Sequence, residues 1–165
     1  MSQPLSNFRG DSIYLDTMIF YTVLRASNRS AHLLLKQVEA GIYQAYTMAL
    51  TFDELAYRML LALIRDKYGK SPQDHLRQNQ VGVVTEFYPQ IERLLHQLLL
   101  LPNLTVLNVT SADLGAMHRN CLAYHLLPRD ALHLAAMQKV GCTNIVSLDS
   151  DFDQVLGIQR YVFEP

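Results

Sequence analysis

The residues Ser12-Ile13-Tyr14-Leu15-Asp16 are the strongest indication of the fold, because they form a short apolar run that ends at a carboxylate. The stretch Asn144-Ile145-Val146-Ser147-Leu148-Asp149 repeats this pattern near the other end of the chain. Continuous apolar runs of this length are typical of parallel strands that are covered on both faces. We therefore expect two buried strands of one parallel sheet, at residues 12–15 and 144–148.

Further strands and helices are predicted around these two runs. Strands are expected at residues 45–49 and 104–109, with an edge strand at residues 159–163. Helical spacing of apolar residues predicts helices at residues 31–40, 52–65, 111–124 and 130–140. Strands that alternate with helices predict one α/β domain over residues 1–165, with a mostly parallel sheet of four or five strands flanked by helices.

The composition excludes several classes of protein. Of the 165 residues, 50% are hydrophobic and 18% are charged, which excludes intrinsic disorder and indicates that a partner covers part of the surface. With a formal net charge of −1, the chain is not basic, unlike most nucleic-acid binders. No apolar run reaches the roughly 18 residues of a membrane span. The N-terminus has neither a basic start nor an apolar stretch, so we expect a cytoplasmic protein without a membrane partner.

The middle of the chain, about residues 66–100, interrupts the alternation. A polar turn at residues 67–72 precedes a long helical stretch at residues 84–100. An apolar stripe along this stretch consists of Ile91, Leu94, Leu95, Leu98 and Leu99. Two interpretations follow: a helix packed deep in the domain, or a helical excursion that pairs with another chain. The second motivates the hypothesis of a homodimer that also holds a partner strand or helix in a groove.

Four acidic residues fall where ligands gather in open α/β sheets, outside the carboxyl ends of strands. Asp16 and Asp149 each follow a strand, Glu54 lies in the expected first turn of a helix, and Asp130 opens another helix. Each has a structural alternative. Glu54 fits a capping box with Thr51, Asp130 could complement a helix dipole, Asp16 could cap a helix, and Asp149 could be a turn residue.

Together the four carboxylates favour a metal site. Like charges at about 4 Å cost on the order of 1 to 4 kcal/mol per pair, and a bound cation removes that cost. Carboxylate ligands without His or Cys are typical of hard ions, so Mg²⁺ or Mn²⁺ is the expected cofactor.

Other sites are excluded or carry little support. The run Asp149-Ser150-Asp151-Phe152-Asp153 begins like a calcium loop, but Gln154 and Arg160 stand where that loop needs Gly and Glu. The chain has no glycine-rich phosphate loop. Three histidines are expected to solvate helix faces or fill hydrogen bonds, and both cysteines to be buried thiols: His118, His125, His133, Cys121 and Cys142.

The chain resembles the PIN-domain ribonucleases, and within them the VapC-type toxins of toxin–antitoxin pairs. Four segments carry the resemblance: Ile13-Tyr14-Leu15-Asp16-Thr17, Thr51-Phe52-Asp53-Glu54-Leu55, Arg129-Asp130-Ala131-Leu132-His133-Leu134-Ala135 and Ile145-Val146-Ser147-Leu148-Asp149-Ser150-Asp151-Phe152. The resemblance implies a metal-dependent endoribonuclease with an RNA substrate and a cognate antitoxin. The metal ligands and catalytic residues it implies are Asp16, Glu54, Asp130 and Asp149. It also implies that Asp151 is an auxiliary acid, and that Ser147 or Thr17 orients a carboxylate or a water.

The mechanism that the resemblance implies is in-line attack on a phosphodiester by a water that the metal activates, which leaves a 5′-phosphate and a 3′-hydroxyl. The candidate phosphate contacts are Arg25, Arg29, Arg58 and Arg129, and for each of them the alternative is a solvated helix face.

Two features depart from the family pattern. Met18 stands where the family has a small polar residue, and the middle helical stretch is longer than in compact toxins. They motivate an alternative, a PIN-fold module that binds RNA or protein and catalyses only weakly.

Overall fold

The computed structural model of the chain describes residues 1–69 and 71–163, so Lys70 of the predicted polar turn and the last two residues of the predicted domain lie outside it. Six parallel strands form one sheet in the order β1-β6-β5-β2-β3-β4. They are β1 (Gln3–Pro4), β2 (Ser12–Leu15), β3 (Gln44–Met48), β4 (Leu104–Leu107), β5 (Asn144–Val146) and β6 (Gln159–Val162). The predicted parallel α/β fold is confirmed, with one strand more than expected.

Strand β2 lies inside the sheet, between β5 and β3, and a hydrophobic cluster covers each of its faces. Ile13 and Leu15 face one hydrophobic cluster and Tyr14, between them, faces the other; all three are fully buried. This alternation follows from the two-residue period of a strand. The two apolar runs, at residues 12–15 and 144–148, contribute neighbouring strands, because Tyr14 of β2 pairs with Ile145 of β5.

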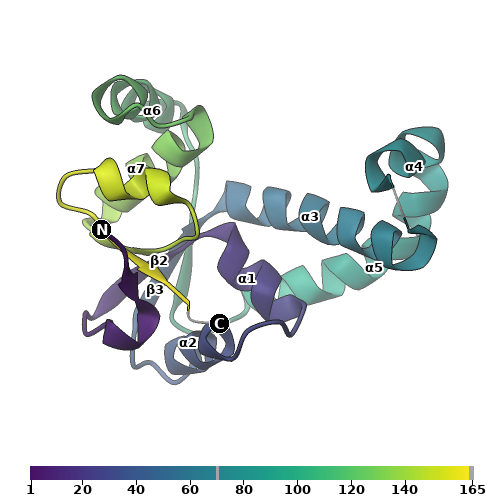
Figure 1. Cartoon of the computed structure of the whole chain (residues 1–165), viewed down its shortest axis with the longest axis horizontal. Helices are drawn as coiled ribbons and strands as arrows, with labels where there is room; N and C mark the ends of the chain where they lie inside the picture. The colour runs from purple at the N-terminus through teal and green to yellow at the C-terminus, as the bar shows by residue number, and fades with distance from the viewer. Residues whose placement is uncertain (70, 164–165) are drawn as a thin grey trace.

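Helices cover both faces of the sheet (Figure 1). On one face lie α1 (Thr17–Leu24), α2 (Arg29–Glu39), α3 (Ala49–Tyr68) and α5 (Gln80–Leu99), and on the other α6 (Ser111–Tyr124) and α7 (Pro128–Val140). Short helical turns, η1 (Leu5–Asn7) and η2 (Ser150–Gln154), follow β1 and β5. Among the described residues, no helix combines the length and hydrophobicity of a membrane span.

The middle of the chain forms an arm. Helices α3 and α5 run side by side away from the sheet, and α4 (Pro72–Gln78) closes the far end (Figure 1). Ile91 and Leu98 of α5 are buried in the core, whereas Val81, nearer the tip, is 80% exposed. Val83 and Phe87 are buried as well, so α5 packs against the core cluster along most of its length, as the first interpretation predicts. Pairing of this stretch with another chain stays a prediction.

Several sequence expectations need correction. The two-residue strand β1 is too short to show the period of a strand in the sequence. The expected polar turn at residues 67–72 is shorter than predicted, because α3 continues to Tyr68 and α4 begins at Pro72. Helix α3 begins at Ala49, before the predicted start, so Glu54 lies in its second turn and does not form a capping box with Thr51. Thr51 instead receives a hydrogen bond from the Thr47 hydroxyl at 2.9 Å. Both cysteines are free, but Cys121 is only half-buried.

Candidate active site

Four acidic residues predicted from the sequence line one cavity of about 360 Å³: Asp16, Glu54, Asp130 and Asp149. Asp16 directly follows β2, Asp149 follows β5, Asp130 lies in the first turn of α7, and Glu54 comes from α3. The parallel sheet explains the convergence, because the carboxyl ends of β2 and β5 lie at one edge and α7 begins beside them.

Asp16 combines two of the roles that the sequence left open. It caps α1, and its Oδ1 accepts a hydrogen bond from the Thr17 backbone N–H at 2.6 Å. Its other oxygen, Oδ2, accepts a hydrogen bond from the Ser147 hydroxyl at 2.7 Å. The carboxylate is thus held by the first residue of α1 and by the residue that follows β5, and it lines the cavity.

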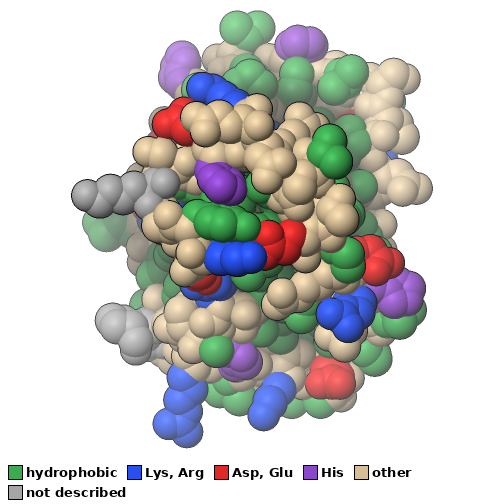
Figure 2. Space-filling model, turned by 90° about the vertical axis from the view of Figure 1, so that its right-hand side faces the viewer, with side chains coloured by type: hydrophobic (Ala, Val, Ile, Leu, Met, Phe, Trp, Pro, Cys, Tyr) green, Lys and Arg blue, Asp and Glu red, His purple; other side chains and the backbone are tan. Residues whose placement is uncertain are grey.

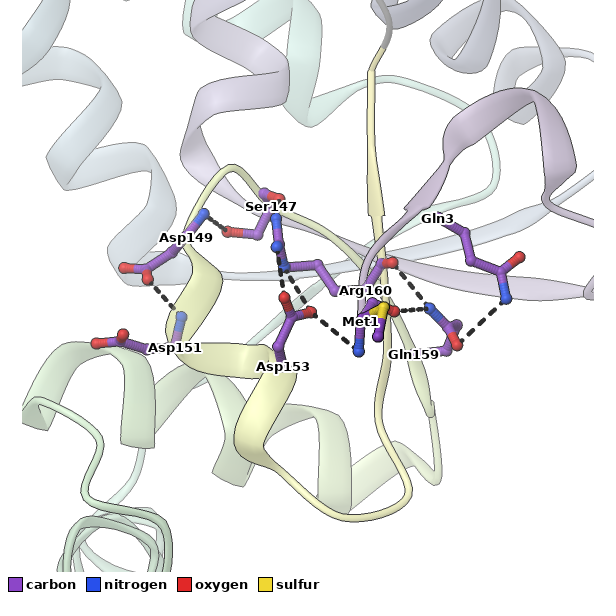
Figure 3. A network of polar contacts seen from close by, with 8 residues as sticks. All are labelled: Met1, Gln3, Ser147, Asp149, Asp151, Asp153, Gln159 and Arg160. Atoms are coloured by element: carbon purple, nitrogen blue, oxygen red, sulfur yellow. Dashed lines mark hydrogen bonds and ion pairs between the residues drawn. The ribbon is translucent and has the colours of Figure 1, made fainter.

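The loop after β5 is held by a chain of hydrogen bonds. The backbone N–H of Asp149 donates to the Ser147 hydroxyl at 3.0 Å, and Asp149 Oδ1 accepts from the Asp151 N–H at 2.9 Å. Figure 3 shows Arg160 reaching this loop from β6, where it donates to the Ser147 carbonyl at 3.1 Å and pairs with Asp153 at 2.8 Å. Arg160 is only 6% exposed, so it ties the carboxylate loop to the sheet from within.

Glu54 is held by cations rather than by a helix end. Arg58 contacts its Oε1 at 2.7 Å, Arg129 contacts its Oε2 at 3.5 Å, and the Thr17 hydroxyl donates to the same Oε2 at 3.1 Å. Burial raises the pKa of Glu54. The hydrogen bond and charge of Arg58, the hydrogen bond from Thr17 and the charge of Arg129 together lower the pKa by more than burial raises it, so the net shift is downward. Glu54 is therefore an anion at neutral pH.

Asp130 has the opposite environment. Burial, followed by the charges of Asp149, Asp16, Asp151 and Glu54, raises the pKa of Asp130 to about 6. One oxygen from each of Asp130, Asp149 and Asp151 lies within 4.8 Å of the others, and Asp16 and Glu54 line the same cavity outside that group. These carboxylates repel each other as the sequence analysis expected.

The four arginines proposed as phosphate contacts separate into two pairs. Arg58 and Arg129 line the cavity, but Arg25 and Arg29 do not. Arg25 makes a two-pronged ion pair with Asp66, at 2.6 and 3.2 Å, and Arg29 is the first residue of α2.

Two residues near the cavity were missed as contributors to the site. His133, grouped in the sequence with His118 and His125, is 2% exposed, lines the cavity, and its Nδ1 lies 3.0 Å from the Tyr14 hydroxyl. Its position three residues after Asp130 on one helix was the available signal. Arg160 had no such signal, because its role depends on Ser147 and Asp153 from other segments.

The donor set fits a hard divalent cation. The acidic side chains in and beside the cavity offer carboxylate oxygens, which Mg²⁺ and Mn²⁺ prefer. A cation placed among them would remove the repulsion that raises the pKa of Asp130.

Comparisons with known proteins agree with this geometry. A family model described as the PIN domain matches residues 13–157. VapBC2 from Rickettsia felis, solved bound to a DNA fragment from its promoter, superposes with a TM-score of 0.61 at 13% identity, over 93% of this chain and 99% of that one. A toxin–antitoxin complex from Klebsiella pneumoniae gives a TM-score of 0.57 at 18% identity, over 88% and 94%. None of the curated proteins matches the chain in sequence.

Proposed function

The chain belongs to the PIN domain family, and from that premise we propose that it is a VapC-like toxin, a metal-dependent endoribonuclease that hydrolyses RNA phosphodiester bonds in the cytoplasm. The observation that carries the proposal is the convergence of Asp16, Glu54, Asp130 and Asp149 on one cavity. The family consists of nucleases, and both structural neighbours come from toxin–antitoxin complexes. The RNA substrate and the metal belong to the proposal.

The four cavity carboxylates are the proposed metal ligands, with Asp151 as an auxiliary acid. A bound Mg²⁺ or Mn²⁺ would neutralise them and activate a water for attack on a phosphorus centre. Ser147 orients Asp16 through its hydroxyl, and Thr17 orients Glu54, so both hydroxyls position carboxylates. The raised pKa of Asp130 is the electrostatic sign that these groups share one site.

Arg58 and Arg129 are the proposed phosphate contacts at the cavity. Both are partly exposed and already lie at its rim beside Glu54, where a guanidinium can turn toward an incoming phosphate oxygen. These two cations also give the rim local positive charge, although the chain as a whole has a formal net charge of −1.

A cognate antitoxin and a second copy of the chain are the proposed protein partners. The arm leaves apolar side chains uncovered, including Tyr57, Val84 and Tyr88, which are between 39% and 51% exposed. Contiguous apolar surface of this kind is typical of interaction sites. Light scattering of the protein alone, and after addition of the product of a neighbouring small gene, measures both associations.

RNA cleavage with Mg²⁺ or Mn²⁺ tests the nuclease proposal. We expect the wild-type protein to leave 5′-phosphate and 3′-hydroxyl ends. Asp16→Asn and Asp130→Asn should each lower the rate by about 100-fold or more, because each removes a ligand charge. Asp74→Asn, an exposed acid of α4, serves as the matched control and should cut at the wild-type rate.

Equal activity in all of these proteins would contradict the proposal. The alternative module, which binds RNA or protein and catalyses only weakly, is favoured by Met18, whose side chain lines the cavity beside Asp16. That alternative predicts RNA binding with no metal-dependent turnover, and it fails if turnover is seen and disappears with Asp149→Asn.

A further inference from the structure

A second depression adjoins the acidic cavity on the surface between α1 and α3. It encloses about 190 Å³ and is lined by Tyr21, Arg58, Leu61, Ala62 and Arg65. We call it the α1–α3 groove. Arg58 lines both hollows, so the groove begins at the rim of the acidic cavity.

The groove has a defined direction because its floor is one face of a helix. Arg58, Leu61, Ala62 and Arg65 follow one another at helical spacing along α3, and Tyr21 comes from α1. A rise of 1.5 Å per residue places Arg65 roughly 10 Å beyond Arg58 and about 16 Å beyond Glu54 along the helix. The groove therefore leads from the carboxylates toward the arm.

Arg65 is a cation of this surface, and its charge acts on the neighbouring Asp66. It is exposed, and no carboxylate in the described part of the chain lies within ion-pair distance of its guanidinium. The neighbouring acid, Asp66, is already neutralised by the two-pronged pair with Arg25. Arg25, expected from the sequence to contact phosphate, is thus engaged with Asp66, and the direct hydrogen bonds of that carboxylate come from Arg25 rather than from Arg65.

Tyr21 gives the groove an aromatic wall. It is half-buried against the core, so its ring is held in place, and it lines the groove together with Leu61. A fixed aromatic ring beside a cation is the combination with which proteins bind single-stranded nucleic acids, because the ring stacks on a base and the cation contacts the backbone.

We propose that the α1–α3 groove binds one unpaired nucleotide of a single-stranded RNA next to the phosphate held in the acidic cavity, with Tyr21 stacking on its base and Arg65 contacting its phosphate. This inference rests on the proposed function, since it assumes RNA in the cavity. A single strand is favoured over a duplex because the groove is small and its base-binding wall needs an exposed base face. On the face that the arm presents, basic side chains lie scattered among acidic and apolar ones (Figure 2).

Binding of a fluorescently labelled single-stranded RNA, followed by anisotropy with Mg²⁺ present, tests the proposal. The parent protein is Asp130→Asn, which is expected to cut the probe about 100-fold or more slowly than the wild-type protein, so that binding is measured on intact RNA. In that background, Tyr21→Leu and Arg65→Gln should each raise the Kd by about 5- to 150-fold, the range that loss of one stacked base or one charged contact produces. Tyr21→Phe keeps the ring and should bind as the parent does.

Salt dependence separates the two contacts from a general loss of structure. Arg65→Gln should reduce the slope of log Kd against log salt by about 0.7, and Tyr21→Leu should leave it unchanged, because only the arginine displaces a counterion. Arg77→Gln at the tip of the arm, with a side chain 82% exposed, is the matched control for loss of one charge and should keep the parent Kd. A duplex of the same sequence should not respond to Tyr21→Leu.

Unchanged Kd and salt slope in both groove variants, with a parent that binds RNA, would overturn this inference and leave the nuclease proposal standing. That result would also be expected if a protein segment occupied the groove. The expected binding pattern without any cleavage by the wild-type protein would overturn the nuclease proposal instead. A parent that binds no RNA would overturn both.

Discussion

Asp130 is the residue whose pKa responds to burial and to the charges of the other carboxylates around the cavity. Four other carboxylates and burial hold its pKa near 6, above the usual value for Asp. In the unfolded chain the group titrates near 4, so between about pH 4 and 6 the folded state binds more protons than the unfolded state. The contribution of Asp130 to the free energy of unfolding is therefore least favourable above pH 6, where the carboxyl is charged in both the folded and the unfolded state.

We predict that Asp130→Asn stabilises the metal-free protein at pH 7.5. The neutral amide removes the repulsion, and after allowance for solvent screening the gain is about 1 kcal/mol, or roughly 2 to 4 °C in Tm. The gain should shrink as the pH falls through 6 and vanish below about 4, where the wild-type group is protonated in both states. Thermal melts with a chelator at four pH values measure this.

Asp113→Asn is the opposite-sign control for that experiment. Hydrogen bonds from Thr110, joined by Lys139, hold the pKa of Asp113 below its usual value, and the side chain completes the capping box of α6. The same substitution should therefore lower Tm at pH 7.5. A lower Tm for Asp130→Asn as well would show that the cavity charges do not repel.

At the scale of elements, the site depends on how the loop after β5 is held against β6. Asp153 comes from η2 and the Ser147 carbonyl from the end of β5, and one buried guanidinium, Arg160 of β6, joins them. The hydrogen bond from Arg160 to the Ser147 carbonyl fixes the start of the segment that contains Asp149 and Asp151. Arg160 is thus a positioning residue for the carboxylates.

We predict that Arg160→Met destabilises the protein by about 2 to 4 kcal/mol at neutral pH, because it leaves a carbonyl and a partly buried carboxylate without their partner. Arg160 holds the pKa of Asp153 below its usual value, so the stabilisation from this pair is present above about pH 4 and is lost as the pH falls through the pKa of the folded state. Urea unfolding at pH 7 and at pH 3 should show a smaller difference at pH 3.

Arg77→Met provides the comparison, since its ion pair with Asp74 spans 3.9 Å on the surface and should contribute less than about 1 kcal/mol. A loss no larger for Arg160→Met than for Arg77→Met would mean that the loop is held by other contacts.

At the scale of the whole molecule, a metal site that is built only by the fold should couple metal binding to folding. A ligand that binds the folded state alone stabilises it by about 2.7 kcal/mol at a hundredfold excess over its Kd. We predict that millimolar Mn²⁺ raises Tm by about 5 to 10 °C, and that Asp130→Asn, although more stable without metal, loses that response. Differential scanning of both proteins with and without Mn²⁺ measures it.

No shift at millimolar Mn²⁺ in the wild-type protein would contradict an assembled site, independently of any substrate. An equal shift in both proteins would place the bound ion elsewhere on the chain.

Local sequence pattern was enough to predict five of the six strands and to place the carboxylates at the ends of strands and starts of helices. A buried parallel strand shows as an unbroken apolar run, and the residue that follows it stands at the ligand-binding edge, so Asp16 could be placed from local pattern alone. The start of α3 could not be placed in this way, because its N-cap residue, Met48, makes no side-chain cap hydrogen bond and so leaves no capping signal in the sequence.

Only the tertiary structure decided which groups act together. The buried Arg160, the Tyr14–His133 contact and the adjoining groove of Tyr21 and Arg65 each join segments that are far apart in sequence or on different helices. Burial and charge pairing depend on distance in space, which local sequence pattern does not encode. For the same reason the ion pair of Arg25 with Asp66, and the raised pKa of Asp130, became visible only once the chain was folded.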